Sequence, residues 1–255
     1  METIAEHISW FTRYAEKEKA LEKEDVGPME LKYDHTMRVL ENARDIVTVE
    51  GFEPELGRVA LLASLYHDIA RFEQFRLYRT FKDRDSIDHG DLGVRILRES
   101  DALAGETQKC REIVLTAVGL HNRFELPATC TGDALLVTKV TRDADKLDIV
   151  RVIDGHLSAT RPYSQTVTLQ LPDDPAIASE KVIQAALERR VASYGDLTSV
   201  NDLRLLLASW LHDLSFESSK KRFIQQGYAR HILEALPTSG VYAEARRCMM
   251  AALTP

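Results

Sequence analysis

The residues with the clearest chemical potential are His67 and Asp68, which stand next to each other at the end of an apolar segment. Leu61 and Leu65 recur there at helical spacing, so most of residues 61–72 should form a buried helix. An imidazole and a carboxylate at the end of such a helix can hydrogen-bond to each other or bind a metal ion. For an isolated His–Asp pair the hydrogen bond is the more frequent explanation. Neighbours on a helix point about 100° apart, so both can bind one ion only from different sides, near the helix end.

Further histidines and aspartates are spread along the first part of the chain. In chain order, the candidate metal ligands are His35, His67, Asp68, His89, His121 and Asp145. Imidazole and carboxylate donors without thiolates suit one or two divalent ions such as Mn, Fe, Co, Ni or Zn. Water bound between two such ions becomes hydroxide near neutral pH, and each ion can polarise a phosphoryl oxygen. A cluster of this kind would therefore suit hydrolysis of a phosphate ester.

The hydrophobic pattern predicts an all-α fold that could bring these residues together. The predicted helices of the first part cover residues 4–23, 29–49, 54–70, 87–99, 107–120 and 133–153, with Ser86 as the N-cap of the fourth. Later in the chain, the pattern predicts a short strand at 166–171 and helices at 176–193, 200–213, 218–236 and 240–252. This change of character predicts a metal-binding domain over residues 1–155 and a C-terminal helical extension over 156–255. The extension would pack on the first part, or form one continuous domain with it.

Composition limits the class of protein. The chain has 255 residues, of which 44% are hydrophobic and 29% charged, and its formal net charge is −7. That charge argues against a duplex nucleic-acid binder. We find no apolar run of membrane-spanning length and no signal-peptide core, and the three scattered cysteines are typical of reduced thiols. These features predict a cytoplasmic protein with no membrane partner, and they leave its oligomeric state open.

The order of the candidate ligands resembles the H…HD…D signature of the HD superfamily of metal-dependent phosphohydrolases. The matching residues are His35, the pair His67 and Asp68, and Asp145 in the run Asp145–Lys146–Leu147. Residues 67–75, 78–81 and 86–90 also resemble a bacterial HD subfamily, for which the sequence discloses no substrate. The likeness covers about residues 30–155 clearly and the C-terminal part only loosely. It implies an HD-domain helical bundle with a C-terminal helical extension.

The resemblance implies that a primary metal ion is held by His35, His67, Asp68 and Asp145. Asp145 is preferred over Asp143 because the last ligand of the family usually precedes a basic residue and a leucine. Asp143 lies roughly 200° around the same helix and is expected to form a salt bridge or a cap. His89 and His121 fall where two-metal members carry further histidines, so they would bind a second ion or contact the substrate phosphate. The alternative is that each is a polar residue at a helix end.

Candidates for binding the substrate phosphate are Arg71, Lys82, Arg142 and Lys146. Arg71 is preferred because it lies just beyond the His–Asp pair and its planar guanidinium suits bidentate contact with phosphate. Related enzymes carry a carboxylate directly after the pair for acid–base chemistry, whereas this chain has Arg71 there. We therefore expect Glu73 or Asp88 to take that role beside the catalytic Asp68.

These patterns predict a metal-dependent phosphohydrolase, a phosphomonoesterase or phosphodiesterase, acting on a nucleotide or another small phosphate ester through a metal-activated water. One alternative is a di-iron HD-type oxygenase, for which His89 and His121 would complete the ligand set. Another is a non-catalytic nucleotide-sensing HD module.

Overall fold

The computed structural model describes residues 3–158 and 167–254 of the chain. These residues form helices and no strand, which confirms the all-α prediction. The chain divides into two compact units, Met1–Asp148 and Ile149–Pro255. The predicted domain boundary at residue 155 stays a prediction.

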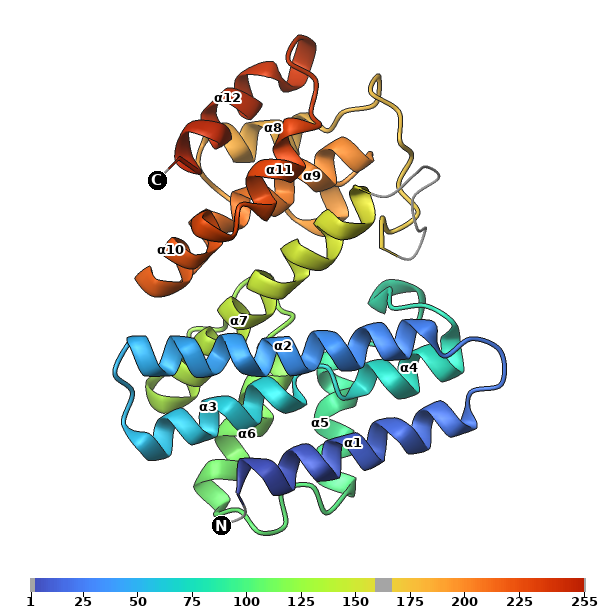
Figure 1. The fold of residues 1–255 in the computed structure, drawn as a ribbon, viewed down its shortest axis with the longest axis vertical. Coiled ribbons are helices and arrows are strands. Elements are labelled where there is room, and N and C mark those ends of the chain that lie inside the picture. The colour runs from blue at the N-terminus through green and yellow to red at the C-terminus, as the bar shows by residue number, and fades with distance from the viewer. Residues whose placement is uncertain (1–2, 159–166, 255) are drawn as a thin grey trace. The chain divides into compact units, whose positions relative to one another are not determined.

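The first unit holds every residue that the sequence singled out for chemistry. Its helices are α1 (Ile4–Leu21), α2 (Gly27–Val49), α3 (Pro54–Tyr66), α4 (Ala70–Tyr78), η1 (Asp83–Asp85), α5 (His89–Glu99), α6 (Gln108–Leu120) and the first part of α7 (Gly132–Leu157). Helix α3 packs against α1, α2 and α6, while α4 packs against α1, α2 and α5 (Figure 1). The junction between α3 and α4 therefore lies at the centre of the unit.

An aromatic cluster packs against this junction. Tyr66 and Phe72, which flank it, and Phe11 of α1 are fully buried. The ring of Phe11 lies 5.7 Å from that of Phe72, and the ring of Trp10 lies 6.0 Å from that of Tyr66, both edge-on. Burying one such side chain contributes up to about 3 kcal/mol. The amphipathic face of α1 is thus an anchor for the junction.

The junction itself corrects one sequence prediction. The helix predicted over residues 54–70 ends at Tyr66, and residues 67–69 form a turn before α4 begins. The end of a helix leaves carbonyl groups without partners. Here Nδ1 of His67 donates to the carbonyl of Ser64 over 2.8 Å, and the amide of Ile69 bonds to Tyr66 over 3.1 Å. His67 and Asp68 therefore lie in a tight turn between two helices rather than on the last turn of one.

The start of α5 also differs from the prediction. Its N-cap is Asp88, whose carboxylate accepts the amide of Asp91 at 3.0 Å, whereas Ser86 had been expected there. The Ser86 hydroxyl instead donates to the Lys82 carbonyl and accepts from Gln74. His89 is consequently the first residue of α5.

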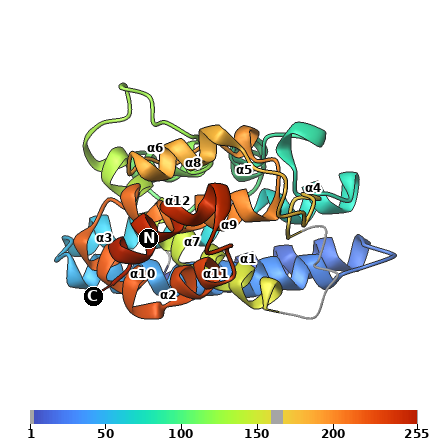
Figure 2. The ribbon, with the colours of Figure 1, turned by 90° about the horizontal axis from the view of Figure 1, so that it is seen from above.

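The second unit is helical over its described residues. It contains the end of α7 with α8 (Glu180–Leu187), η2 (Tyr194–Asp196), α9 (Val200–Ser209), η3 (Trp210–His212), α10 (Glu217–Gln226), α11 (Tyr228–Glu234), η4 (Gly240–Tyr242) and α12 (Ala243–Ala252). Helices α8, α9, α11 and α12 pack together, as Figure 2 shows.

Several predicted elements of the second unit are shorter or absent. The strand predicted at 166–171 is wrong where the structure describes it, because residues 167–170 form a turn; residue 166 lies outside the described residues. The helix predicted over 218–236 is broken at Gly227, which has a φ of +74°, a conformation that glycine adopts without steric cost. The helix predicted over 176–193 is limited to α8.

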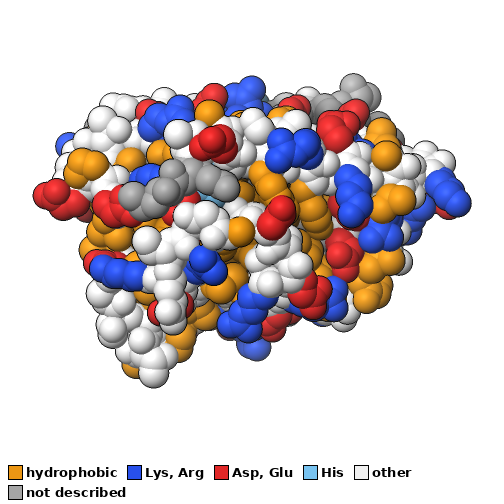
Figure 3. Space-filling view, turned by 90° about the horizontal axis from the view of Figure 1, so that it is seen from below, with side chains coloured by type: hydrophobic (Ala, Val, Ile, Leu, Met, Phe, Trp, Pro, Cys, Tyr) orange, Lys and Arg blue, Asp and Glu red, His pale blue; other side chains and the backbone are white. Residues whose placement is uncertain are grey.

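The surface and the helices carry two further observations. On the face drawn in Figure 3, acidic and basic side chains are interspersed among hydrophobic ones, so that face offers no continuous positive surface for duplex nucleic acid. Among the residues that the structure describes, no helix has both the length and the apolar character needed to cross a bilayer.

A buried ionic network joins α1 to α3 and to the segment before α6. Glu106, only 2% exposed, accepts from Arg58 and lies 3.0 Å from Nε2 of His7, whose Nδ1 meets the Tyr66 hydroxyl at 2.9 Å. The hydrogen bond from Arg58 lowers the pKa of Glu106 to about 2. A carboxylate with a lowered pKa stabilises the fold above its ordinary pKa of 4.5 and loses that contribution as the pH falls toward 2.

We expect Glu106→Gln to lower the free energy of unfolding of the first unit by about 3 kcal/mol at neutral pH, because it breaks a buried ion pair. Urea unfolding in a Trp210→Phe background measures this, since Trp10 then reports on the first unit alone. The difference between variant and parent should shrink as the pH falls from about 5 toward 2. The exposed Glu41→Gln on α2 is the control. A cost below about 0.5 kcal/mol, typical of a surface site, would contradict the role of this network.

Candidate metal centre

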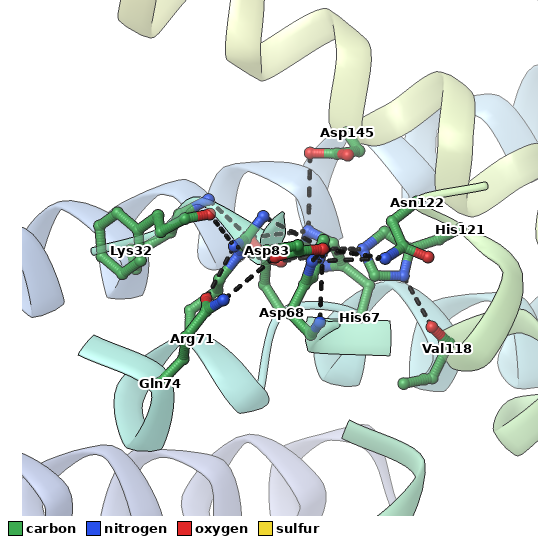
Figure 4. A network of polar contacts seen from close by, with 12 residues as sticks. Lys32, His67, Asp68, Arg71, Gln74, Asp83, Val118, His121, Asn122 and Asp145 are labelled. Carbon is green, nitrogen blue, oxygen red and sulfur yellow. Dashed lines mark hydrogen bonds and ion pairs between the residues drawn. The ribbon is translucent and has the colours of Figure 1, made fainter. Parts of the chain in front are cut away.

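The six candidate ligands come from separate parts of the first unit and meet at one place. Figure 4 labels four of them, His67, Asp68, His121 and Asp145. They are His35 on α2, His67 and Asp68 in the turn between α3 and α4, His89 at the start of α5, His121 directly after α6, and Asp145 on α7. They form two groups: His35, His67 and Asp145, and then Asp68, His89 and His121. The structure thus brings together all six residues that the sequence predicted as ligands, and their binding of metal stays a prediction.

In the first group, the donor atoms lie at distances that suit one ion. Oδ1 of Asp145 is 3.0 Å from Nε2 of His35 and 3.6 Å from Nε2 of His67. Oδ2 of Asp68 joins them at 3.7 Å from His35 and 3.6 Å from His67. Ligand atoms around a single ion at about 2.1 Å are separated by about 3.0–3.5 Å in octahedral or tetrahedral geometry. These four atoms therefore lie about as far apart as the ligands of a single ion.

In the second group, Asp68 uses its other oxygen. Nε2 of His89 and Nε2 of His121 are 3.0 Å apart, and Oδ1 of Asp68 lies 3.5 Å from the first and 3.8 Å from the second. One carboxylate thus faces both groups, with Oδ2 toward one and Oδ1 toward the other. This is the arrangement of a carboxylate that bridges two ions.

All four imidazoles are oriented in the same way. Each uses Nδ1 for a protein acceptor: His35 for Asp148 at 2.7 Å, His67 for the Ser64 carbonyl at 2.8 Å, His89 for Asp83 at 2.5 Å, and His121 for the Val118 carbonyl at 2.7 Å. A carbonyl or carboxylate only accepts, so Nδ1 carries the hydrogen and Nε2 of the neutral ring presents a lone pair to the centre. Metal-binding histidines are held in this way in proteins generally.

The donor atoms fit a cation better than they fit one another. Nε2 of His35, Nε2 of His67 and Oδ1 of Asp145 are buried and have no hydrogen-bond partner among the described residues. A buried polar atom without a partner costs about 1–3 kcal/mol. The lone pairs of His89 and His121 also face each other over 3.0 Å, and that of His89 accepts from Nη2 of Arg71 at 3.2 Å. Divalent ions would satisfy all of these atoms, so the residues present fit the metal that the sequence predicts.

The ionisation of the centre suits metal binding. Burial alone would raise the pKa of Asp68, but the neighbouring positive charges, that of Lys32 first and that of Arg71 also, hold it well below its ordinary value. The pKa of Asp145 is also held well below its ordinary value, because the neighbouring imidazoles of His35 and His67 outweigh the effect of its burial. Burial and the adjacent guanidinium of Arg71 lower the pKa of His89 to about 4. Two carboxylates and a neutral imidazole are thus ready to bind an ion at neutral pH.

The basic residues predicted to bind phosphate lie in different places. Arg71 is at the centre, with Nε 3.3 Å from Oδ1 of Asp68, and its Nη1 donates to the Phe81 carbonyl. The guanidinium of Arg142 donates instead to backbone carbonyls of the loop after α6, including that of His121 at 3.1 Å. Lys82 bonds through its backbone to Thr80 and Ser86, and Lys146 is largely buried on α7. Of these four residues, Arg71 therefore has a side chain that contacts a candidate metal ligand, Asp68.

The two carboxylates predicted for acid–base chemistry have partners of their own. Glu73 pairs with Arg95 at 2.9 Å, and Asp88 caps α5 and pairs with Arg123 at 3.2 Å. Their catalytic role stays a prediction.

Sequence reasoning missed Asp148, which orients His35, and two further residues that contact the centre. Nζ of Lys32 is 2.7 Å from Oδ2 of Asp68, and Asp83 orients His89. The hydrogen bond with His89 outweighs burial and lowers the pKa of Asp83. Lys32 could have been found from its position one helical turn before His35, since residues three apart on a helix share a face. Asp83 lies in an irregular segment, where spacing gives no such signal.

Comparison with known proteins identifies a family for one part of the chain. Residues 33–153 match the family model of the HD domain, a range that contains all six candidate ligands. Neither a curated protein nor a solved structure matches the chain.

We expect protein loaded with Mn or Co to hold two ions per chain, as measured by elemental analysis after removal of free metal. His121→Ala should retain about one ion, because only the second group loses a ligand. Asp68→Ala should lose both ions, because its carboxylate serves both groups. His231→Ala, at an exposed histidine of the second unit, is the matched control and should hold two ions. A single ion in the parent protein would contradict the bridging arrangement.

Asp148→Ala should weaken binding at the first group about 10- to 100-fold, since partners of ligating histidines contribute this much to metal affinity. Its carboxylate fixes the ring of His35, whereas the second group keeps all its partners. Titration against a chromogenic chelator would show one weakened and one unchanged ion. Asp133→Ala, at the exposed start of α7, controls for the loss of a surface charge. Equal weakening of both ions would show that Asp148 supports the fold rather than His35.

Proposed function

Since residues 33–153 belong to the HD superfamily, we propose that the protein is a metal-dependent phosphohydrolase that acts on a nucleotide or another small phosphate ester. The observation that carries this proposal is the Asp68 carboxylate, whose two oxygens face two separate groups of donor atoms. Each group contains two imidazoles with their Nε2 atoms toward the centre. Two divalent ions bound by two such groups would be typical of enzymes that hydrolyse phosphate esters.

Two divalent ions held there would supply a hydroxide nucleophile from water and polarise the phosphoryl oxygens. The residues of the chain perform the remaining tasks. Asp68 fixes the separation of the two groups, because its oxygens belong to one carboxylate. Arg71 adds a fixed positive charge beside Oδ1 of Asp68, where charge on a phosphoryl group would be stabilised. Gln74 and Asp83 hold this guanidinium in place, with contacts of 2.8 and 3.1 Å to its Nη1.

The same geometry supports a second candidate, a di-iron oxygenase. Two imidazoles in each group and a shared carboxylate would also suit a pair of iron ions. The positive charges of Lys32 and Arg71 at the shared carboxylate favour the hydrolase, because an anionic substrate gains from them.

We expect protein loaded with Mn, Co or Ni to release phosphate or a nucleoside from a panel of phosphate esters. His67→Ala and Asp68→Ala should each lower kcat/KM about 1,000-fold or more, since removing even one charge-stabilising group from an active site costs up to this factor. His231→Ala should be as active as the parent protein. If the two variants at the centre retain full activity, the assignment of the active site is wrong.

The oxygenase is tested in the same preparations. A hydrolase releases phosphate at the same rate with and without dioxygen, and its iron form consumes no dioxygen when substrate is added. Dioxygen uptake by the iron form, together with no hydrolysis by the Mn, Co and Ni forms, would replace the proposed function by the oxygenase. Binding of nucleotides without either reaction would indicate a sensing module.

A further inference from the structure

We propose that Lys32 selects the substrate of this centre by binding an oxygen of a dianionic phosphate monoester. The proposal rests on the proposed function, since it names the substrate class of the same site. It starts from the position of Lys32, which lies on α2 one turn before His35 and directs its ammonium to Oδ2 of Asp68 over 2.7 Å. Its side chain is 17% exposed, so this charge lies at the edge of the centre rather than deep within it.

The ammonium of Lys32 has donor capacity left for a ligand. It has three hydrogens, and Asp68 is its hydrogen-bond acceptor among the described residues. The ring of Phe81 covers another side, with its centroid 5.6 Å from Nζ. A phosphate oxygen at the centre could therefore accept from Lys32 while the contact with Asp68 persists.

Lys32 and Arg71 contact different oxygens of the Asp68 carboxylate. Lys32 contacts Oδ2 of Asp68, the oxygen nearest His35 and His67, and Arg71 contacts Oδ1, the oxygen nearest the other two histidines. The ring of Phe81 lies near both cations, since its centroid is also 5.7 Å from the guanidinium of Arg71. One cation thus stands beside each group of donor atoms, which suits a phosphate whose oxygens reach both groups.

The two cations differ in mobility. Arg71 is fixed by the Phe81 carbonyl, Gln74 and Asp83. Lys32 carries its charge on a flexible four-carbon stem, so it can follow a substrate oxygen by a small rotation. We therefore assign recognition of the substrate to Lys32 and a fixed charge to Arg71.

The charge of the centre favours a dianion. Four carboxylates belong to it through the contacts described above: Asp68, Asp83, Asp145 and Asp148. With Lys32 and Arg71 they leave two negative charges, and two divalent ions would turn this into two positive charges. A phosphate dianion that displaces the metal-bound hydroxide neutralises both, whereas a diester, with a single negative charge, leaves one uncompensated. Removing Lys32 would lower the charge by one and so reduce the preference for the dianion.

The test compares two ligands that differ by one methyl group, methylphosphonate and its monomethyl ester, the first a dianion and the second a monoanion at about pH 8.5. Calorimetry with Mn-loaded protein should show tighter binding of methylphosphonate. Lys32→Gln should weaken that binding about 10- to 100-fold, the worth of a hydrogen bond between charged groups, and should bind the ester nearly as the parent does. Lys32→Arg should keep part of the preference. Lys17→Gln, at an exposed lysine of α1, is the control and should bind like the parent protein.

Elemental analysis should find two ions in Lys32→Gln, because Lys32 is not among the proposed ligands. Unchanged binding of methylphosphonate by Lys32→Gln, or loss of its ions, would overturn the proposal. If circular dichroism shows that neither Lys32 variant folds, the two ligands are compared with the parent protein alone. Equal binding of the two ligands by the parent protein would overturn the proposal as well. If the parent protein prefers methylphosphonate, Lys32→Gln loses this preference and no ester releases phosphate, the results would support the role of Lys32 and refute the proposed function.

Discussion

The structure of the first unit depends on one buried carboxylate, that of Asp68. It is 3% exposed, and burying an unpaired charge costs several kcal/mol. Lys32 and Arg71 offset this cost from two sides, and the lone pairs of four imidazoles face the same space. Lys32 lies on α2 and Arg71 on α4, while the other candidate ligands come from α2, α5, the end of α6 and, with Asp145, α7, so the unit must bring these helices to the turn between α3 and α4. The fold can be understood as the solution to this requirement.

Close packing of α5 against α6 is the clearest device by which the chain meets it. A Cβ atom on Gly90 would lie 2.8 Å from the Asn122 side chain and 3.1 Å from the carbonyl of Gly119. One on Gly93 would lie 3.0 Å from Val118. Side chains at these positions would push the helices apart, and the rings of His89 and His121, now 4.8 Å between centroids, would separate. The glycines that follow His89 thus matter for the second group of donors rather than for a turn.

The sequence was sufficient to predict the all-α fold from its hydrophobic pattern, and the HD domain and the residues that gather at the centre from their resemblance to the H…HD…D signature. It was insufficient where long-range contacts decide. The break after Tyr66 depends on the hydrogen bond that Nδ1 of His67 donates to the Ser64 carbonyl. The role of Asp83 depends on an irregular segment that folds back on the start of α5, where Asp83 contacts His89. Arg142 appeared free to bind phosphate, and only the path of the loop after α6 shows that backbone carbonyls take its guanidinium.

The charges around Asp68 also bear on the kind of chemistry that this ligand arrangement performs. Dioxygen is uncharged and gains little from a neighbouring ammonium or guanidinium, so a centre devoted to oxygen chemistry has no need of Lys32 and Arg71 beside its shared carboxylate. The negative charge of a phosphoryl group lies on the oxygens that would be nearest these cations. Positive charge that is in place before the reaction stabilises the phosphoryl group more strongly as its negative charge redistributes in the transition state. Two cations that meet opposite oxygens of Asp68 are therefore expected of a centre that acts on a phosphate ester.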